Sequence, residues 1–165
     1  MARTTTPKKT ATLGTIVIGS DHGGIATKRT IIDALVRAGY LIVDVGGFDP
    51  AISDDYPEYA HAVARAVASD KTGKTKGVLI CGTGTGMAIA ANRHKGIRAA
   101  LAYDTYSATM ARHDNDANVV TLRGRRFSAR EAARLALIFL RTPFSRIPRH
   151  QRRIRKIDAT STSKT

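Results

Sequence analysis

The chain has one cysteine, Cys81, at a position where a thiol could do acid–base chemistry. It follows a short apolar run, 77–80, and directly precedes the glycine-rich turn 82–86, which reads Gly-Thr-Gly-Thr-Gly. Alternating glycines before a helix expose backbone N–H groups, which can hold an oxyanion that develops on a substrate. The positive end of a helix also favours the thiolate form of a nearby thiol. A thiolate here could attack a substrate, or remove a proton from a carbon beside a carbonyl.

Plain structural alternatives stay open for these residues. A lone cysteine is most often a small buried hydrophobic residue, and the glycines could serve a tight turn only. The turn is neither a P-loop, because no Gly-Lys-Ser/Thr follows, nor a dinucleotide fingerprint, because its glycine spacing differs. A nucleophilic cysteine would need a His–Asp orienting pair, and Asp21 and His22 are sequence neighbours whose side chains should diverge. We therefore favour proton abstraction by Cys81, with Thr83 as a proton shuttle.

Other side chains capable of chemistry flank the remaining apolar runs. They lie in four segments: Ser20-Asp21-His22-Gly23-Gly24, Asp54-Asp55-Tyr56-Pro57, Arg112-His113-Asp114-Asn115-Asp116 and Arg123-Gly124-Arg125-Arg126. In sheets of parallel strands, ligands bind beyond the carboxyl ends of the strands. We therefore expect these segments and the glycine-rich turn to bring an acid, a histidine, a thiol, hydroxyls and arginines to one edge of a sheet.

Short apolar runs alternate with segments of helical periodicity, which predicts a parallel sheet covered by helices on both faces. The expected strands are 15–19, 40–45, 77–81, 97–102 and 119–122. The expected helices are 25–38, 59–68, the segment from the glycine-rich turn to about 92, 106–112, and a last one that ends at 141. Ser128 is the expected N-cap of that last helix, with Glu131 as its capping-box partner. The pattern indicates a single α/β sandwich of about five parallel strands.

The composition of the 165 residues fits one folded domain with polar tails. Hydrophobic residues make up 42% and charged residues 24%, as in ordinary folded proteins. One cysteine excludes an internal disulfide framework and a cysteine-based structural zinc site. No apolar run approaches the ~20 residues of a membrane-spanning helix, and the polar start of the chain lacks the apolar segment of a secretory signal. We expect a cytoplasmic protein without membrane association, and disordered tails at residues 1–13 and 159–165.

Basic residues outnumber acidic ones, 27 to 13, which gives a net charge of +14. Eight basic residues and one acidic residue lie in 141–165, so this segment carries half of the net charge. From charge alone, a solvated basic tail is favoured over an arginine cluster that binds a phosphate. Nucleic-acid binding by the basic tails is a further hypothesis. It is disfavoured because aromatic residues, on which bases could stack, make up only 5% and include no Trp.

Several motifs together resemble the type B ribose-5-phosphate isomerases, a family that also includes galactose-6-phosphate isomerase subunits. They are Gly19-Ser20-Asp21-His22-Gly23-Gly24, Asp55-Tyr56-Pro57, Ile80-Cys81-Gly82-Thr83-Gly84-Thr85-Gly86, Ala90-Ala91-Asn92 and Arg149-His150-Gln151-Arg152-Arg153. The resemblance covers about 15–158 within an isomerase domain at 14–158. It implies a Rossmann-like three-layer sandwich with a five-stranded parallel sheet. It also implies a homodimer or dimer of dimers with shared active sites, in which segment 141–158 reaches the partner subunit, and no metal or cofactor.

The resemblance further implies a reaction, the interconversion of ribose 5-phosphate and ribulose 5-phosphate through a cis-enediolate. Cys81 would be the base that moves the proton between carbons 1 and 2, and Thr83 would handle the proton on the oxygens. The backbone of the turn would hold the enediolate oxygen through Gly82, Gly84, Thr85 and Gly86. Asp21 and Tyr56 would line the sugar, with Asp21 contributing to ring opening. The remaining substrate-binding positions, mostly for the phosphate, would be His22, Asn115, Arg125, Arg149 and Arg153.

One position departs from the family pattern, in which a histidine that helps to open the furanose ring precedes an asparagine. An alignment without gaps places Asp114 at the histidine position and His113 one residue earlier. On a helix, this offset rotates a side chain by about 100°. One interpretation is sequence drift with slower ring opening. Three others stay open: the His113 side chain reaches the position of the family's histidine, Asp114 replaces that histidine as the acid–base group, or no ring is opened. The last favours an alternative substrate pair, erythrose and erythrulose 4-phosphate, because a tetrose 4-phosphate cannot close a furanose ring.

Overall fold

The computed structural model of the chain describes residues 12–159; most of both predicted tails, 1–11 and 160–165, lies outside this range. Five parallel strands form one sheet in the order β2-β1-β3-β5-β4. The strands are β1 (Thr15–Ser20), β2 (Leu41–Asp44), β3 (Lys76–Cys81), β4 (Ala99–Leu101) and β5 (Val119–Arg123). The helices are α1 (Ile25–Arg37), α2 (Tyr56–Ser69), α3 (Thr85–Ala91), α4 (Thr105–His113), α5 (Ala129–Arg141) and α6 (Pro148–Ala159), with a short 3₁₀ helix, η1, at His22–Gly24. The predicted α/β sandwich is confirmed.

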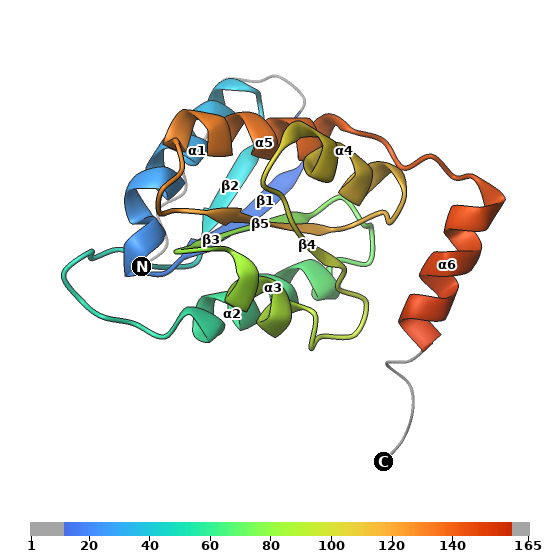
Figure 1. Cartoon of the computed structure of the whole chain (residues 1–165), viewed down its shortest axis with the longest axis horizontal. Coiled ribbons are helices and arrows are strands. Elements are labelled where there is room, and N and C mark those ends of the chain that lie inside the picture. Colours follow the sequence, from blue (N-terminus) through green and yellow to red (C-terminus); the bar gives the residue numbers. More distant parts are fainter. Residues whose placement is uncertain (1–11, 160–165) are drawn as a thin grey trace, which may run out of the picture.

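Helices cover both faces of the sheet (Figure 1). One face packs against α1, α4 and α5 through a core that includes Ile18, Ile80 and Leu122. The other packs against α2 and α3 through a core that includes Val17 and Leu79. Because both sides of each central strand are buried, these strands are nearly continuous apolar runs, as the sequence indicated.

The main differences from the sequence prediction are the start of one helix, the cap of another and one additional helix. Helix α2 begins at Tyr56 rather than 59, because a proline in the first turn of a helix needs no backbone N–H. Ser128 caps α5, but the carboxylate of Glu131 accepts a hydrogen bond from Arg134 at 2.8 Å instead of completing the capping box. Helix α6 was not predicted, since it is strongly polar, has few apolar residues and buries only one residue, His150.

The parallel topology places the segment before a strand and the segment after it at opposite edges of the sheet. Each crossover helix returns the chain from the carboxyl edge of the sheet to its amino edge. His113 ends α4 just before β5, and the backbone N–H of Ser145, which lies beyond α5, donates to the carbonyl of His113 at 3.0 Å. Both therefore lie at the amino edge. The expectation that segment 112–116 would meet Cys81 at one edge is wrong within a single chain.

A side chain, that of Asn92, pairs with the outward-facing backbone groups of Ala99, the first residue of the edge strand β4. Asn92 donates from Nδ2 to the carbonyl of Ala99 at 2.8 Å, and its Oδ1 accepts the N–H of Ala99 at 2.8 Å. The amide of Asn92 thus pairs with the strand as a neighbouring backbone would. Between residues 12 and 159, no helix is long and apolar enough to cross a membrane.

Candidate functional site

The carboxyl ends of β1, β3 and β5 bring one group of the predicted residues together. We call it the carboxyl-edge cluster: Asp21, His22, Tyr56, Cys81, Thr83, Arg125 and the glycine-rich turn 82–86. Backbone hydrogen bonds hold the strand exits side by side. The N–H of Asp21 donates to Ile80 at 3.2 Å, that of Gly124 donates to Cys81 at 2.7 Å, and that of Arg125 donates to Gly82 at 3.2 Å. Ten of the fifteen predicted site residues therefore share one edge.

The thiol of Cys81 lies under the glycine-rich turn, with only 5% of the residue exposed. Its Sγ accepts the backbone N–H of Gly84 at 3.1 Å. Gly84 has a φ of 82°, and a Cβ there would lie 2.6 Å from Cδ1 of Leu101. Only glycine fits this conformation and this space, so the turn can direct an amide hydrogen at the sulfur. The sulfur of Cys81 is thus held against a polar backbone group of the turn.

Two side chains lie directly against glycines of this cluster. The ring of Tyr56 covers Gly86, where a Cβ would lie 2.6 Å from Cζ of the tyrosine. The guanidinium of Arg125 lies across Gly23, where a Cβ would lie 3.0 Å from Nε. Both side chains are still substantially exposed, so each closes one flank of the turn and keeps polar atoms toward solvent. Thr83 is exposed as well, and its Oγ1 accepts the N–H of Thr85 at 3.3 Å.

Asp21 is a buried acid with a carboxylate oxygen, Oδ1, that has no hydrogen-bond partner within residues 12–159. Burial raises the pKa of Asp21, and the nearby charge of Asp54 raises it further. His22, the N–H of Gly23 and Arg125 oppose this rise without cancelling it. The cluster thus contains a carboxyl group that takes up a proton more readily than an ordinary aspartate, which suits proton exchange with a sugar hydroxyl.

Two residues that the sequence analysis did not assign to the site, Asp54 and Tyr59, hold His22. Nδ1 of His22 lies 2.7 Å from Oδ1 of Asp54, and the hydroxyl of Tyr59 donates to Oδ2 at 2.7 Å. The predicted divergence of the Asp21 and His22 side chains agrees with this arrangement, because His22 pairs with Asp54 instead. The sequence contained one signal that Asp54 belongs to the site, since this residue immediately precedes the Asp55-Tyr56-Pro57 motif.

The other five predicted site residues lie at the opposite edge: His113, Asp114, Asn115, Arg149 and Arg153. Together with His150, which was not predicted as a site residue, they form what we call the amino-edge cluster. Nδ1 of His113 lies 2.6 Å from Oδ1 of Asp114, and Nε of Arg149 donates to Nε2 of His150 at 3.0 Å. The pairing with His113 lowers the pKa of Asp114, and the nearby His150 and Arg149 add to the effect despite the opposing influence of partial burial. Arg153 follows Arg149 by four residues and shares its face of α6.

The two clusters are separated by the length of the sheet. Strand β3 alone has six residues, a span of about 16 Å from its first to its last at the usual rise per residue. Figure 1 shows α6 beside the sheet on the side where α4 ends. Arg98 fixes this placement, because its guanidinium donates to the carbonyl of Asp116 at 3.0 Å and to the carboxylate of Asp158 at 3.2 Å.

The amino-edge cluster also contains a set of possible metal ligands. One ligand atom each from His113, Asp114 and His150 lies within 4.8 Å of the others. The same atoms are already paired, since Nδ1 of His150 also lies 2.8 Å from Oγ of Ser145. In addition, the guanidinium of Arg149 donates to Nε2 of His150, and it would place a positive charge beside any bound cation. The chemistry of this set therefore favours an anion nearby over a metal.

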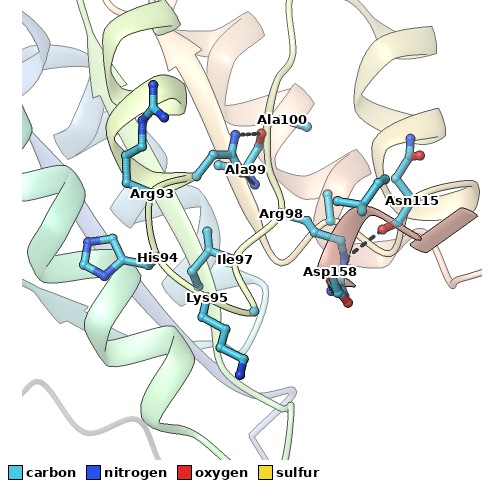
Figure 2. A pocket seen from close by; sticks show the side chains of 13 residues that line it. Arg93, His94, Lys95, Ile97, Arg98, Ala99, Ala100, Asn115 and Asp158 are labelled. Carbon is cyan, nitrogen blue, oxygen red and sulfur yellow. Dashed lines mark hydrogen bonds and ion pairs between the residues drawn. The ribbon is translucent and has the colours of Figure 1, made fainter. Parts of the chain in front are cut away.

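A cavity of about 640 Å³ lies near the amino-edge cluster, between α6 and the segment that joins α3 to β4 (Figure 2). Figure 2 shows Arg93, His94 and Lys95 pointing in three different directions, so their charges do not converge on one anion. Arg98 is engaged by Asp158 and by backbone carbonyls. Apart from Asn115, which also lines this cavity, the residues of the two clusters lie outside it.

Known proteins share both the sequence and the architecture. A family model described as Ribose/Galactose Isomerase matches residues 16–157. Ribose-5-phosphate isomerase B of Mycolicibacterium paratuberculosis is 38% identical over 84% of this chain and 86% of its own length. The type B ribose 5-phosphate isomerase structure of Trypanosoma brucei is 41% identical, with a TM-score of 0.83 over 89% of this chain and 98% of that one.

A further solved structure contains a sugar phosphate. Ribose-5-phosphate isomerase B of Mycoplasma genitalium, determined with bound ribulose-5-phosphate, is 38% identical, with a TM-score of 0.86 over 91% of this chain and 97% of that one. Sequence, fold and family model agree over nearly the whole described range, and the motifs that suggested the resemblance lie within it. The chain belongs to the ribose/galactose isomerase family.

Proposed function

We propose that this chain, a sugar-phosphate aldose–ketose isomerase by family, interconverts ribose 5-phosphate and ribulose 5-phosphate with Cys81 as the general base. The observation that carries the proposal is the contact between Sγ of Cys81 and the N–H of Gly84 at 3.1 Å. It gives a lone, nearly buried thiol a hydrogen-bond donor at the edge of the sheet where parallel α/β proteins bind ligands. The ribulose-5-phosphate bound to the Mycoplasma genitalium relative supports this substrate pair.

The proposed reaction moves one proton between adjacent carbons. The Cys81 thiolate removes the proton from carbon 2 of the open-chain aldose, and the C–H electron pair forms the carbon–carbon double bond of an enediolate. The aldehyde oxygen becomes an oxyanion that the amides of turn 82–86 stabilise. The Cys81 thiol then returns the proton to carbon 1, while Thr83 transfers the hydroxyl proton from oxygen 2 to oxygen 1. Each atom is conserved and no oxidant is consumed.

The proposed active site needs two copies of the chain. The carboxyl-edge and amino-edge clusters cannot meet within one chain, because the length of the sheet lies between them. A second copy that presents its amino-edge cluster to the carboxyl edge of the first would complete the site. Arg149 and Arg153 of one subunit would then bind the phosphate together with His22 and Arg125 of the other. We therefore propose a homodimer, or a dimer of dimers, with shared sites.

His113 is the proposed acid–base group for opening the furanose ring. Asp114, kept ionised by its neighbours, accepts a hydrogen bond from Nδ1 of His113 and leaves Nε2 to exchange a proton with the ring oxygen. This pairing favours a repositioned histidine over replacement of its role by Asp114. The altered position of the histidine still motivates a second candidate, the same isomerisation on erythrose and erythrulose 4-phosphate.

A side-by-side isomerase assay tests the function. Ribose 5-phosphate and erythrulose 4-phosphate are compared by kcat/KM, with Cys81→Ala as the blank. We expect higher efficiency on the pentose. Higher efficiency on the tetrose would replace the proposed substrate with the second candidate, and turnover of neither would overturn both.

A further inference from the structure

A single carboxylate, from a residue 32 positions away, holds His22 by both its backbone and its ring. Oδ1 of Asp54 accepts the backbone N–H of His22 at 2.9 Å and lies 2.7 Å from Nδ1. The first bond fixes the main chain at the start of η1, and the second fixes the rotation of the imidazole. With Nδ1 committed to Asp54, Nε2 is the ring nitrogen left for a ligand.

The carboxylate is itself held from α2. The hydroxyl of Tyr59 donates to Oδ2 of Asp54 at 2.7 Å, so the two oxygens of Asp54 serve two different partners. The Asp54 side chain is 13% exposed and that of His22 is 29% exposed. Burial alone would raise the pKa of Asp54, but the hydrogen bonds from His22 and Tyr59 outweigh it and lower the pKa. The same contact raises the pKa of Tyr59 to about 12.

We propose that Asp54 is a positioning residue, which aims Nε2 of His22 at the substrate phosphate, and that Tyr59 locks the carboxylate of Asp54 in place. A carboxylate that accepts from one imidazole nitrogen and orients the other toward a ligand is a recurrent device in binding and catalytic sites. The inference rests on the proposed function, because that function places a phosphosugar at the carboxyl edge.

Other charged groups around the pair set the expected pH effects. The ones that act on Asp54, on His22 or on their partners are Asp21, Glu58, Tyr59 and Arg125. The negative charge of Asp54 contributes to the raised pKa of Asp21. Removing that charge should lower the pKa of Asp21 as well as weaken the hold on His22.

The first test separates binding from chemistry in the full-length isomerase. Asp54→Asn removes the charge while its amide oxygen can still accept a hydrogen bond, Asp54→Ala removes both, and Tyr59→Phe frees Oδ2. Asp49→Asn, which removes an exposed charge from the same loop, is the matched control. KM for ribose 5-phosphate and the inhibition constant of inorganic phosphate are measured for each variant.

We expect both constants to rise about tenfold in Asp54→Asn and more in Asp54→Ala, with kcat within about twofold, because a phosphate contact binds substrate and transition state alike. Tyr59→Phe should raise both about threefold, and Asp49→Asn should match the wild type. An unchanged inhibition constant in Asp54→Asn and Asp54→Ala would overturn the proposal. So would a loss confined to kcat, because Asp54 would then act on the chemistry rather than on the phosphate.

The second test does not depend on activity. Ultraviolet titration follows the ionisation of tyrosines in the wild type, in Asp54→Asn and in Tyr59→Phe. The wild type should show a step near pH 12, as expected for Tyr59. The step should lose the amplitude of one tyrosine in Tyr59→Phe, while Tyr40, whose pKa burial also raises, continues to titrate. In Asp54→Asn the same amplitude should shift toward pH 10. An identical titration in the wild type and Asp54→Asn would show that the Tyr59–Asp54 contact is absent in solution. If the titration behaves as expected but wild-type protein does not isomerise ribose 5-phosphate, the proposed function fails rather than the Asp54 contact.

Discussion

His113 and Asp114 are neighbours in the chain, and yet Nδ1 of His113 lies 2.6 Å from Oδ1 of Asp114. The contact forms where helical geometry ends, since His113 is the last residue of α4 and Asp114 is its C-cap. His22, by contrast, does not pair in this way with its neighbour Asp21, because its ring is held by Asp54 at 2.7 Å. A pair of adjacent residues can thus act as a dyad where a helix ends.

This dyad predicts a substrate-dependent effect of Asp114→Asn. Loss of the carboxylate should lower kcat/KM on ribose 5-phosphate about tenfold, since the imidazole loses its orienting partner. Activity on erythrose 4-phosphate, which needs no ring opening, should change little. The measurement is the ratio of the two efficiencies in variant and wild type. Equal losses on both substrates would assign Asp114 to binding or folding instead.

Replacing the proposed base should abolish turnover without unfolding the protein. Cys81→Ala removes one small buried side chain from the core beside α3, and we expect kcat to fall at least ~10²-fold with an unchanged circular dichroism spectrum. Retained activity would mean that another group abstracts the proton.

The location of the two clusters at opposite edges predicts complementation between inactive subunits. Cys81→Ala lacks the base, and the double variant Arg149→Ala/Arg153→Ala lacks the amino-edge cations. In a mixed dimer, one of the two sites combines the intact amino-edge cluster of the Cys81→Ala subunit with the intact carboxyl-edge cluster of the other subunit. Co-refolding of equal amounts should therefore restore about a quarter of wild-type activity, because half of the dimers are mixed and each has one intact site. If no activity returns, each site is formed by one chain.

Asp21 predicts a pH-dependent stability difference. Its pKa in the folded protein lies above the ordinary 3.8, so between these two values the unfolded chain has lost a proton that the folded one retains. The stability that this residue contributes is complete below 3.8 and is lost as the pH rises through the folded value. The stability of Asp21→Asn relative to the wild type should therefore be greater at pH 8 than at pH 4, as measured by denaturant unfolding. A stability difference that does not depend on pH would show that burial does not raise the pKa of Asp21.

The sequence indicated the sheet because its strands are short, apolar and bounded by glycine or polar residues, as in the run that ends at Cys81. It also indicated the carboxyl-edge cluster, because residues that directly follow a strand must lie at that edge. It failed for His113, because the end of a crossover helix lies at the opposite edge, and for α6, because its contact with Arg98 comes from a distant segment. The pairing of Asp54 with His22 depends on the path of the loop between β2 and α2, which no local pattern specifies.

The side-chain amide of Asn92 has a consequence for how the protein behaves at high concentration. An open edge strand is a template on which another chain can add a strand, and long flat edges promote aggregation. Here β4 is only three residues long, and Asn92 occupies both outward-facing backbone groups of Ala99. Too little unpaired backbone is left on this strand to recruit a foreign one. The short strand and the Asn92 amide therefore end the sheet at β4, and they protect this edge against edge-to-edge polymerisation.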